Sequence, residues 1–336
     1  MKLVLAGAQH FHMYHLLDYV QETGKAVFAG VYDDDRNGLQ EISDKYGVPK
    51  YDDLDEMLQT CQPDVVACFA KPSTRGKVIA KCLGAGVSVL ADKPPVLNLE
   101  ELHDLKKVVS GMSGPKFTVL LSERYNPPVR TLKRIVDDGE IGDIVNFTAF
   151  RPHKMKKSER PDWFFRRQDY GGILVDLAIH DVDIFHWITG RKILEVTAHA
   201  GNFTVPEYPE FEDNGQIIFR ADGGVTGLIK VDWLAPSAHP THGDCRYFIT
   251  GTKGTIEVKT GGDIGTTGGT ITVCTETKPP YSVTLDRVES DLYGDFFAAI
   301  KDNAEPAISM KDVFEAMQVV LAARDAADDN CIISLE

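Results

Sequence analysis

Short apolar runs alternate with amphipathic stretches from the start of the chain to Leu121. Runs of this length, bounded by glycine, proline or polar residues, are typical of buried parallel strands. They predict strands at Leu3–Ala6, Ala26–Tyr32, Asp64–Ala70, Val87–Ala91 and Phe117–Leu121. Helical periodicity between them predicts helices at His12–Thr23, Arg36–Tyr46, Gly76–Ala85 and Glu100–Ser110. Alternating βα units of this kind indicate an α/β fold with a doubly wound parallel sheet.

The pattern changes after Asn126-Pro127-Pro128. Longer alternating segments predict strands at Ile144–Phe150, Glu195–Ala200, Asn214–Arg220, Val225–Trp233, Arg246–Thr250, Gly254–Lys259, Gly269–Thr275 and Ile332–Leu335. Helices are predicted at Val129–Asp138, Val175–Thr189, Leu292–Asn303 and Met310–Ala327. Glycine-rich turns favour a large, mostly antiparallel open sheet. We therefore expect two domains, an N-terminal one at 1–122 and a C-terminal α+β domain at 123–336.

Charge and composition exclude several classes of protein. The net charge of -14 argues against binding to nucleic acids or anionic membranes. No apolar run has membrane-spanning length, and 43% hydrophobic with 26% charged residues is ordinary for a globular protein. The six cysteines form no CxxC pair and no zinc-like spacing. We expect reduced thiols, a cytoplasmic location and a small-molecule partner.

The loop Gly7-Ala8-Gln9-His10-Phe11-His12 joins the first predicted strand to the first predicted helix. A dinucleotide-binding turn reads GxGxxG, and here Gln9 and His12 replace the second and third glycines. Asp33 ends the second strand, where a carboxylate accepts the ribose hydroxyls, and Asp34 follows it. Alternatively, these aspartates begin a turn and cap the next helix. The acidic pair favours NAD and makes NADP less likely, although Arg36 is close.

Three histidines near this turn, His10, His12 and His15, suggest a metal site at first reading. We expect no carboxylate or cysteine partner for a metal nearby. The N-terminus of a helix also disfavours a cation. We therefore predict no metal.

The predicted helix from Val175 carries Asp176, His180 and Asp183 at spacings i, i+4 and i+7, on one face. Ionisable groups beside a buried face cost free energy unless they are paired or used. Either they form structural pairs, or His180 is a general base with Asp176 as its orienting carboxylate. Asp183 fits a supporting role better.

Lys93 follows a predicted central strand, within Asp92-Lys93-Pro94. Ligands of doubly wound sheets lie at the carboxyl ends of the strands, where a lysine stabilises a developing alkoxide. The alternative is an ordinary loop lysine paired with Asp92.

Several motifs occur in an order that resembles one enzyme family. They are the Gly7 turn, Phe69–Thr74, Asp92-Lys93-Pro94, Arg124–Pro127, Gly171-Gly172 through Asp176 and His180, and Tyr247–Thr255. Together they resemble the glucose–fructose oxidoreductase / inositol dehydrogenase / MocA-type (Gfo/Idh/MocA) family of NAD(P)-dependent oxidoreductases, along nearly the whole chain. Besides the turn, the chain departs from that pattern with Arg75 in place of histidine and Asp92 in place of glutamate.

The resemblance implies a Rossmann domain followed by a substrate-binding domain. It implies that Lys93, Asp176 and His180 are the catalytic group. The implied cofactor-binding residues are Gly7, Ala8, Gln9, His10, Phe11, His12, Asp33, Asp34, Ala70, Lys71, Pro72, Thr74, Asp92 and Lys93. We expect substrate contacts from Lys93, Arg124, Tyr125, Trp163, Asp176 and His180.

Residues 151–167 form a basic segment that also contains Trp163, Phe164 and Phe165. It either recognises a carboxylate or phosphate beside a sugar ring, or is a solvated loop or subunit contact with its aromatic side chains packed beneath.

The predicted function is NAD(P)-dependent hydride transfer at a hydroxyl or ketone carbon of a sugar, sugar derivative or cyclitol. Two alternatives stay open: a nucleotide-binding sensor without turnover, and glycoside cleavage assisted by NAD. A large antiparallel sheet with one uncovered face also predicts a homodimer or homotetramer.

Overall fold

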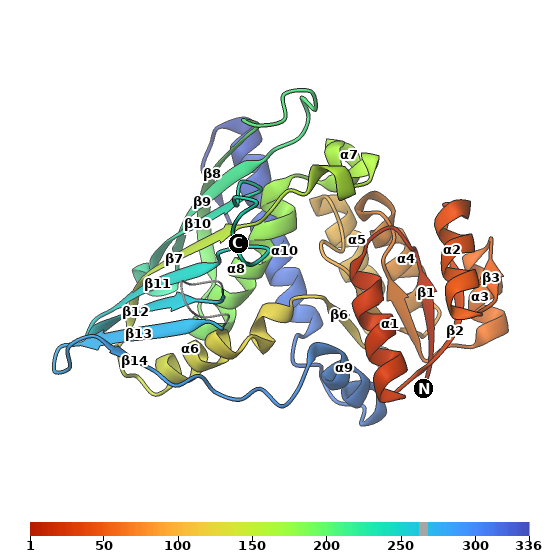
Figure 1. Ribbon diagram of the computed structural model, residues 1–336, viewed down its shortest axis with the longest axis horizontal. Coiled ribbons are helices and arrows are strands. Elements are labelled where there is room, and N and C mark those ends of the chain that lie inside the picture. The colour runs from red at the N-terminus through yellow and green to blue at the C-terminus, as the bar shows by residue number, and fades with distance from the viewer. Residues whose placement is uncertain (262–267, 336) are drawn as a thin grey trace. The chain divides into compact units, whose positions relative to one another are not determined.

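The computed structural model describes residues 1–261 and 268–335, without the side chain of Asn37 (Figure 1). The chain divides into two compact units. The first contains Met1–Leu120, Gln168–Tyr170 and Ser290–Phe314, and the second contains Leu121–Arg167, Gly171–Glu289 and Glu315–Glu336. Each unit is described by itself. The functional boundary expected between residues 122 and 123 stays a prediction.

The first unit contains a six-stranded parallel sheet in the order β3-β2-β1-β4-β5-β6. Its strands are β1 (Lys2–Ala6), β2 (Val27–Tyr32), β3 (Lys50–Tyr51), β4 (Val65–Cys68), β5 (Ser88–Ala91) and β6 (Phe117–Val119). The strand order reverses between β1 and β4, the point at which ligands bind in such sheets. The predicted doubly wound parallel sheet is confirmed.

The helices of this unit are α1 (His12–Thr23), α2 (Arg36–Tyr46), α3 (Leu54–Cys61), α4 (Pro72–Gly84), α5 (Leu99–Val109) and α9 (Leu292–Lys301). Local chemistry sets several of their ends. Gly24 ends α1 with φ 63°, and Asn98 caps α5 by accepting from the Glu101 backbone N–H at 2.8 Å. The sequence pattern missed β3 and α3, because a two-residue strand and an eight-residue helix contain too few residues to establish a period.

The second unit contains a nine-stranded sheet in the order β14-β13-β12-β11-β7-β10-β9-β8-β15. Its strands are β7 (Ile144–Pro152), β8 (Ile193–Gly201), β9 (Asn214–Ala221), β10 (Thr226–Asp232), β11 (Arg246–Gly251), β12 (Gly254–Lys259), β13 (Thr270–Thr275), β14 (Tyr281–Ser282) and β15 (Ile333–Ser334). Among the described residues, every strand pairing of this sheet is antiparallel except that of β7 with β10. The predicted mostly antiparallel sheet is therefore also confirmed.

Helix α8 (Ile173–Thr189) lies along this sheet and contacts β7, β8, β9 and β10 (Figure 1). It begins two residues before the predicted start at Val175, because Gly171 and Gly172 both adopt positive φ and the helix starts directly after them. The other helices are α6 (Pro127–Asp137), α7 (Arg167–Tyr170) and α10 (Met310–Asp329), with the 3-10 turns η1 (Ser122–Tyr125), η2 (Lys157–Glu159), η3 (Asp162–Phe165) and η4 (Asp222–Gly224). Within the described residues, no helix is both long and apolar enough to cross a membrane.

Candidate active site and cofactor site

The first βα turn is built around Gly7, which adopts φ +89°. A Cβ atom at this position would lie 2.1 Å from the backbone nitrogen of Ala70, so only glycine fits. The Gly7 N–H donates to the Tyr32 carbonyl at 2.7 Å, and the Gln9 N–H donates to the Phe69 carbonyl at 3.2 Å. The turn therefore lies against the ends of both β2 and β4, at the switch point of the sheet.

Asp33, at the end of β2, is 5% exposed and has several donors close to its carboxylate. It accepts from the Ala8 backbone N–H and from Gln9 Nε2, which lies 2.9 Å and 3.1 Å from its two oxygens. It also accepts from the Asp35 N–H at 2.9 Å, as an aspartate that begins a turn does. Asp33 therefore begins a turn, as the alternative interpretation expects, and its contact with the adenosine ribose stays a prediction.

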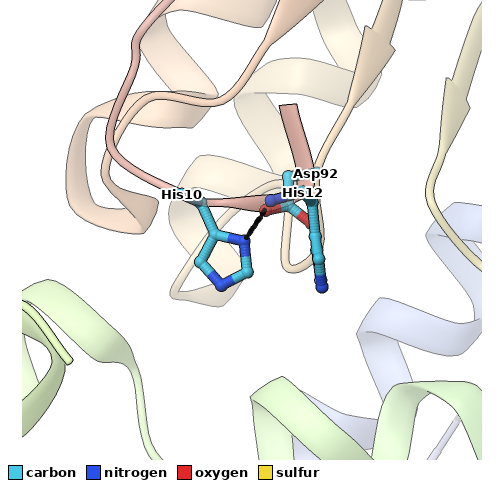
Figure 2. A group of neighbouring side chains, drawn as sticks. All are labelled: His10, His12 and Asp92. Carbon is cyan, nitrogen blue, oxygen red and sulfur yellow. Dashed lines mark hydrogen bonds and ion pairs between the residues drawn. The ribbon is translucent and has the colours of Figure 1, made fainter. Parts of the chain in front are cut away.

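His10 and His12 both contact Asp92, which follows β5 and is fully buried (Figure 2). His10 Nδ1 lies 3.0 Å from Asp92 Oδ2, and His12 Nδ1 lies 3.0 Å from Asp92 Oδ1. The Lys93 backbone N–H donates to Oδ1 at 2.8 Å. The expectation that these histidines have no carboxylate partner nearby is wrong, because β5 brings Asp92 beside the turn.

The two imidazoles and the carboxylate influence one another's ionisation. Burial lowers the pKa of His10 to about 4 against the opposing effect of Asp92, so the ring is neutral near pH 7. Burial disfavours the charge of Asp92, but His10 and His12 outweigh it and hold the pKa of this carboxyl well below its ordinary value. An ionised carboxylate therefore faces two imidazole nitrogens.

Arg75 ties the β4 and β5 loops together and is itself fully buried. Its Nε donates to the Ala70 carbonyl at 3.1 Å and its Nη1 to the Pro94 carbonyl at 2.6 Å. Its Nη2 lies 3.8 Å from Asp92 Oδ2. Sequence reasoning noted Arg75 only as a departure from the family pattern and missed this role, which depends on two loops that are distant in the chain.

The other cofactor candidates of this unit lie on the same loops. Lys71 immediately precedes α4, Pro72 is its first residue, and Thr74 Oγ1 donates to the Lys71 carbonyl at 3.2 Å. Asp34 accepts from the Tyr32 hydroxyl at 2.6 Å, and Phe11 is 49% exposed. Lys93, 8% exposed, precedes a cis peptide bond to Pro94.

In the second unit, α8 begins with an unusual cap. Gly172 adopts φ +94°, and the Ile173 N–H donates to Glu212 Oε2 at 3.1 Å. Glu212 also accepts from Arg167. Asp176 lies in the first turn of α8 and His180 one turn later, and these side chains are 7% and 8% exposed.

Two further carboxylates on α8 are held by arginines. Arg151 donates to both oxygens of Asp181, at 2.7 Å and 3.0 Å, and to the Tyr247 hydroxyl at 2.9 Å. Burial disfavours the charge of Arg151, but Asp181 outweighs it and holds the pKa of this guanidinium well above its ordinary value. Arg124 binds both oxygens of Asp183, at 2.8 Å and 2.5 Å. Asp183 therefore has the supporting role expected, while its pairing favours a structural role for Arg124 as well.

The basic segment 151–167 has its aromatic side chains packed beneath it. Trp163, Phe164 and Phe165 are 6%, 3% and 6% exposed, and Arg160 lies over the rings of Phe164 and Trp233, at 4.5 Å and 4.7 Å. Arg151 belongs to the buried network described above. The aromatic side chains of the segment 151–167 are therefore packed beneath it, as one of the two alternatives expects. A substrate contact from Trp163 stays a prediction. Tyr125 is half-buried and lies beneath Arg130, whose guanidinium carbon is 5.3 Å from its ring centre.

The structure thus gathers the predicted residues in two groups. In the first unit, the Gly7–His12 turn, Asp33, the β4 loop, Asp92 and Lys93 lie at the carboxyl ends of β1, β2, β4 and β5. In the second, Asp176 and His180 share the start of α8. Together with the strand order, the first group defines a dinucleotide-binding unit.

Two family models match the chain and specify this class further. The model for the oxidoreductase family with an NAD-binding Rossmann fold (GFO_IDH_MocA) matches residues 1–114, and the model for the GFO/IDH/MocA C-terminal domain matches residues 129–257. The chain belongs to the Gfo/Idh/MocA family of NAD-binding oxidoreductases. The predictions of family, NAD as cofactor and oxidoreductase class are confirmed.

Known proteins of this family resemble the chain along most of its length. The NAD(+)-dependent scyllo-inositol 2-dehydrogenase of Bacillus subtilis (strain 168) is 26% identical over 77% of this chain and 74% of its own. Inositol 2-dehydrogenase of Rhizobium meliloti (strain 1021) is 26% identical over 80% of each chain. A solved oxidoreductase structure from Erwinia carotovora atroseptica covers 97% of this chain and 98% of its own with a TM-score of 0.87 and 28% identity.

Proposed function

We propose that this protein is a dehydrogenase that transfers hydride between NAD and a hydroxyl or ketone carbon of a sugar, sugar derivative or cyclitol. The relatives named as inositol dehydrogenases support the substrate class. One observation carries the proposal. In a chain of an NAD-binding oxidoreductase family, Lys93 and His180 are each only 8% exposed, and both belong to the catalytic group that the sequence resemblance implies. Burial of this kind costs free energy and is typical of residues kept for chemistry.

Each polar residue has a defined task in this proposal. When bound, the nicotinamide ring accepts a hydride from the substrate carbon. His180 removes the proton from the substrate hydroxyl, for which its neutral form is required. The Lys93 ammonium donates a hydrogen bond to the same oxygen and stabilises negative charge that develops on it. Asp176 orients the substrate or His180.

The residues of the first unit hold the dinucleotide. Asp33 accepts hydrogen bonds from the adenosine ribose hydroxyls, which replace those from Gln9. The first turn of α1 has no side-chain cap and no acidic residue, so its N–H groups favour phosphate oxygens. The negative charge of Asp34 repels a 2′-phosphate, which is why NADP is the weaker candidate.

A panel of cyclitols, aldoses and sugar acids, assayed for NADH formation, tests the proposal. We expect one class to turn over, and His180→Ala to lower kcat about 10²–10⁴-fold with little change in NAD affinity. His199→Ala is the matched control, because His199 is an exposed histidine on β8 of the same unit. Full turnover by His180→Ala would contradict the assigned base.

A nucleotide-binding sensor is the second candidate. The observation that favours it is the turn itself, where Gln9 and His12 replace two glycines and the His12 ring lies against Asp92. If NAD binds while no substrate of the panel and no reverse reaction gives turnover, this candidate replaces the first.

We also propose that a second copy of the chain covers the uncovered face of the nine-stranded sheet. Ile218, Leu228 and Phe248 lie in one cross-strand row with Thr148, and Ile218 and Phe248 are 51% and 38% exposed. Apolar side chains in a continuous row are typical of a subunit interface. Sedimentation of the full chain should give a dimer or tetramer, and a monomer at micromolar concentration would contradict this.

A further inference from the structure

The cluster of His10, His12 and Asp92 contains more ligand atoms than the proposed redox reaction uses. The two imidazole Nδ1 atoms and the Asp92 carboxylate lie within 4.8 Å of one another. Each oxygen of the carboxylate faces a different imidazole at 3.0 Å. Figure 2 shows both rings extending away from Asp92 in the same direction, so both Nδ1 atoms point back to it.

A proton or a cation must lie in each of these two contacts, because a carboxylate oxygen and an unprotonated ring nitrogen repel each other at 3.0 Å. The 3.0 Å contact of His10 with Asp92 Oδ2 is poorly directed for a hydrogen bond, and no better-directed donor reaches this fully buried oxygen among the described residues. The Nδ1 of His10 also lies 3.5 Å from the His12 backbone N–H, as an acceptor nitrogen would. These features suit a cation better than a shared proton at Oδ2.

We propose that His10, His12 and Asp92 bind a divalent transition-metal ion of the Zn²⁺ class. Two imidazoles and one carboxylate are a common zinc ligand set that leaves a coordination position open. Tetrahedral ligands at about 2.1 Å from one ion are about 3.4 Å apart, so ligand atoms that now lie within 4.8 Å of one another must approach by up to about 1.4 Å. The proposal does not rest on the redox function.

The surroundings decide which ions fit. The His10 and His12 side chains are 15% and 27% exposed, so an ion has a path to the buried carboxylate. Arg75, 3.8 Å from Oδ2, and the N-terminus of α1 add positive potential that opposes any cation. An ion that bonds strongly to imidazole overcomes this, whereas Mg²⁺ and Ca²⁺, which prefer oxygen ligands, do not.

Isothermal titration of the EDTA-treated, desalted full chain with ZnCl₂ tests the site, with MgCl₂ as a parallel titrant. We expect one equivalent of Zn²⁺ and no Mg²⁺ to bind. His10→Ala, His12→Ala and Asp92→Asn should each weaken binding at least about tenfold, since even outer-shell partners of a metal are worth that much. His15→Ala is the matched control, because His15 is an exposed histidine on α1 outside the cluster.

Zn²⁺ binding that survives in both histidine variants would overturn the proposal, because exposed groups such as Cys331 would then be the ligands. Absence of binding to the wild type would overturn it as well and leave a hydrogen-bonded cluster only. If Asp92→Asn does not fold, the two histidine variants still decide, since both positions are partly exposed. Titration with NAD in EDTA reports separately on the proposed function, so the two failures are distinguishable.

Discussion

Helix α8 carries two pairs of buried ionisable residues that differ in what surrounds them. Asp181 and Asp183 are each 1% exposed, and each is bound through both oxygens by an arginine, Arg151 or Arg124. Asp176 and His180 are slightly more exposed, at 7% and 8%, and lie nearer the N-terminus of the helix. The first pair therefore holds α8 in its unit, whereas the second is suited to reaction with a ligand.

Burial alone therefore does not distinguish the two carboxylates that arginines bind from Asp176, the carboxylate proposed to act in catalysis. A bidentate guanidinium fixes a carboxylate in one place and one charge state. A carboxylate one helical turn from an imidazole instead supplies, in the proposed function, the base and the group that orients it. The following predictions test whether the two pairs differ in this way.

The largest effect on stability is expected for Arg151→Met. The substitution leaves Asp181 buried with its charge uncompensated, which costs about 3–5 kcal/mol. Urea unfolding followed by far-UV circular dichroism measures the loss. Replacing Asp181 by Leu in the same chain should recover most of it, because both charges of the pair are then gone. If the double variant is as unstable as Arg151→Met alone, then Arg151 and Asp181 stabilise the fold by more than the neutralisation of each other's charge.

A smaller effect is expected for Asp183→Asn, about 2 kcal/mol, because asparagine still accepts one hydrogen bond from Arg124 but leaves the buried guanidinium without its counter-charge. Asp176→Asn is the matched substitution on the same helix. It should lower kcat far more than it lowers the free energy of unfolding. We therefore expect Asp183→Asn to lose more stability and Asp176→Asn to lose more of its kcat. An equal loss of stability in both variants would contradict the difference between the two pairs.

Much of the fold follows from local patterns in the sequence. Apart from the exposed Lys2, the strands β1, β4 and β5 are short runs of fully or nearly fully buried side chains, and α1 and α2 have the bounds that their periodicity predicts. Residues with distant partners were not predictable in the same way. Arg151 was read as part of a basic loop because nothing in its surroundings along the chain shows Asp181 and Tyr247.

The same limit applies to the candidate site. Gly7 and Asp33 were found because a strand ending and a turn have a fixed spacing in this fold. The contact of His12 with Asp92 joins positions 80 residues apart, and only the parallel pairing of β1, β4 and β5 brings them together. The proposed set of metal ligands could therefore not be inferred from residues that are neighbours in the sequence, although each of its residues was predicted individually to bind the cofactor.

The smallest effect concerns Glu212, the residue that caps α8 and thereby positions Asp176 and His180. Burial raises the pKa of Glu212, although the charge of Arg167 opposes the shift. The folded protein therefore holds this proton more tightly than the unfolded chain. As pH rises from about 4.5, the ordinary value for Glu, through the folded pKa, the wild type should lose stability relative to Glu212→Gln.

At higher pH the difference between the two proteins should become constant. The glutamine side chain of the variant still accepts the Ile173 N–H, so we expect a change of no more than about 1 kcal/mol, the usual worth of a helix cap. Urea unfolding at a series of pH values measures it, with Glu210→Gln as the control because Glu210 is exposed in the same segment. If the stability of the wild type instead rises with pH relative to Glu212→Gln, the charge of Arg167 outweighs the effect of burial on the pKa of Glu212. The start of α8 would then be held by an arginine–carboxylate ion pair, as Asp181 and Asp183 are.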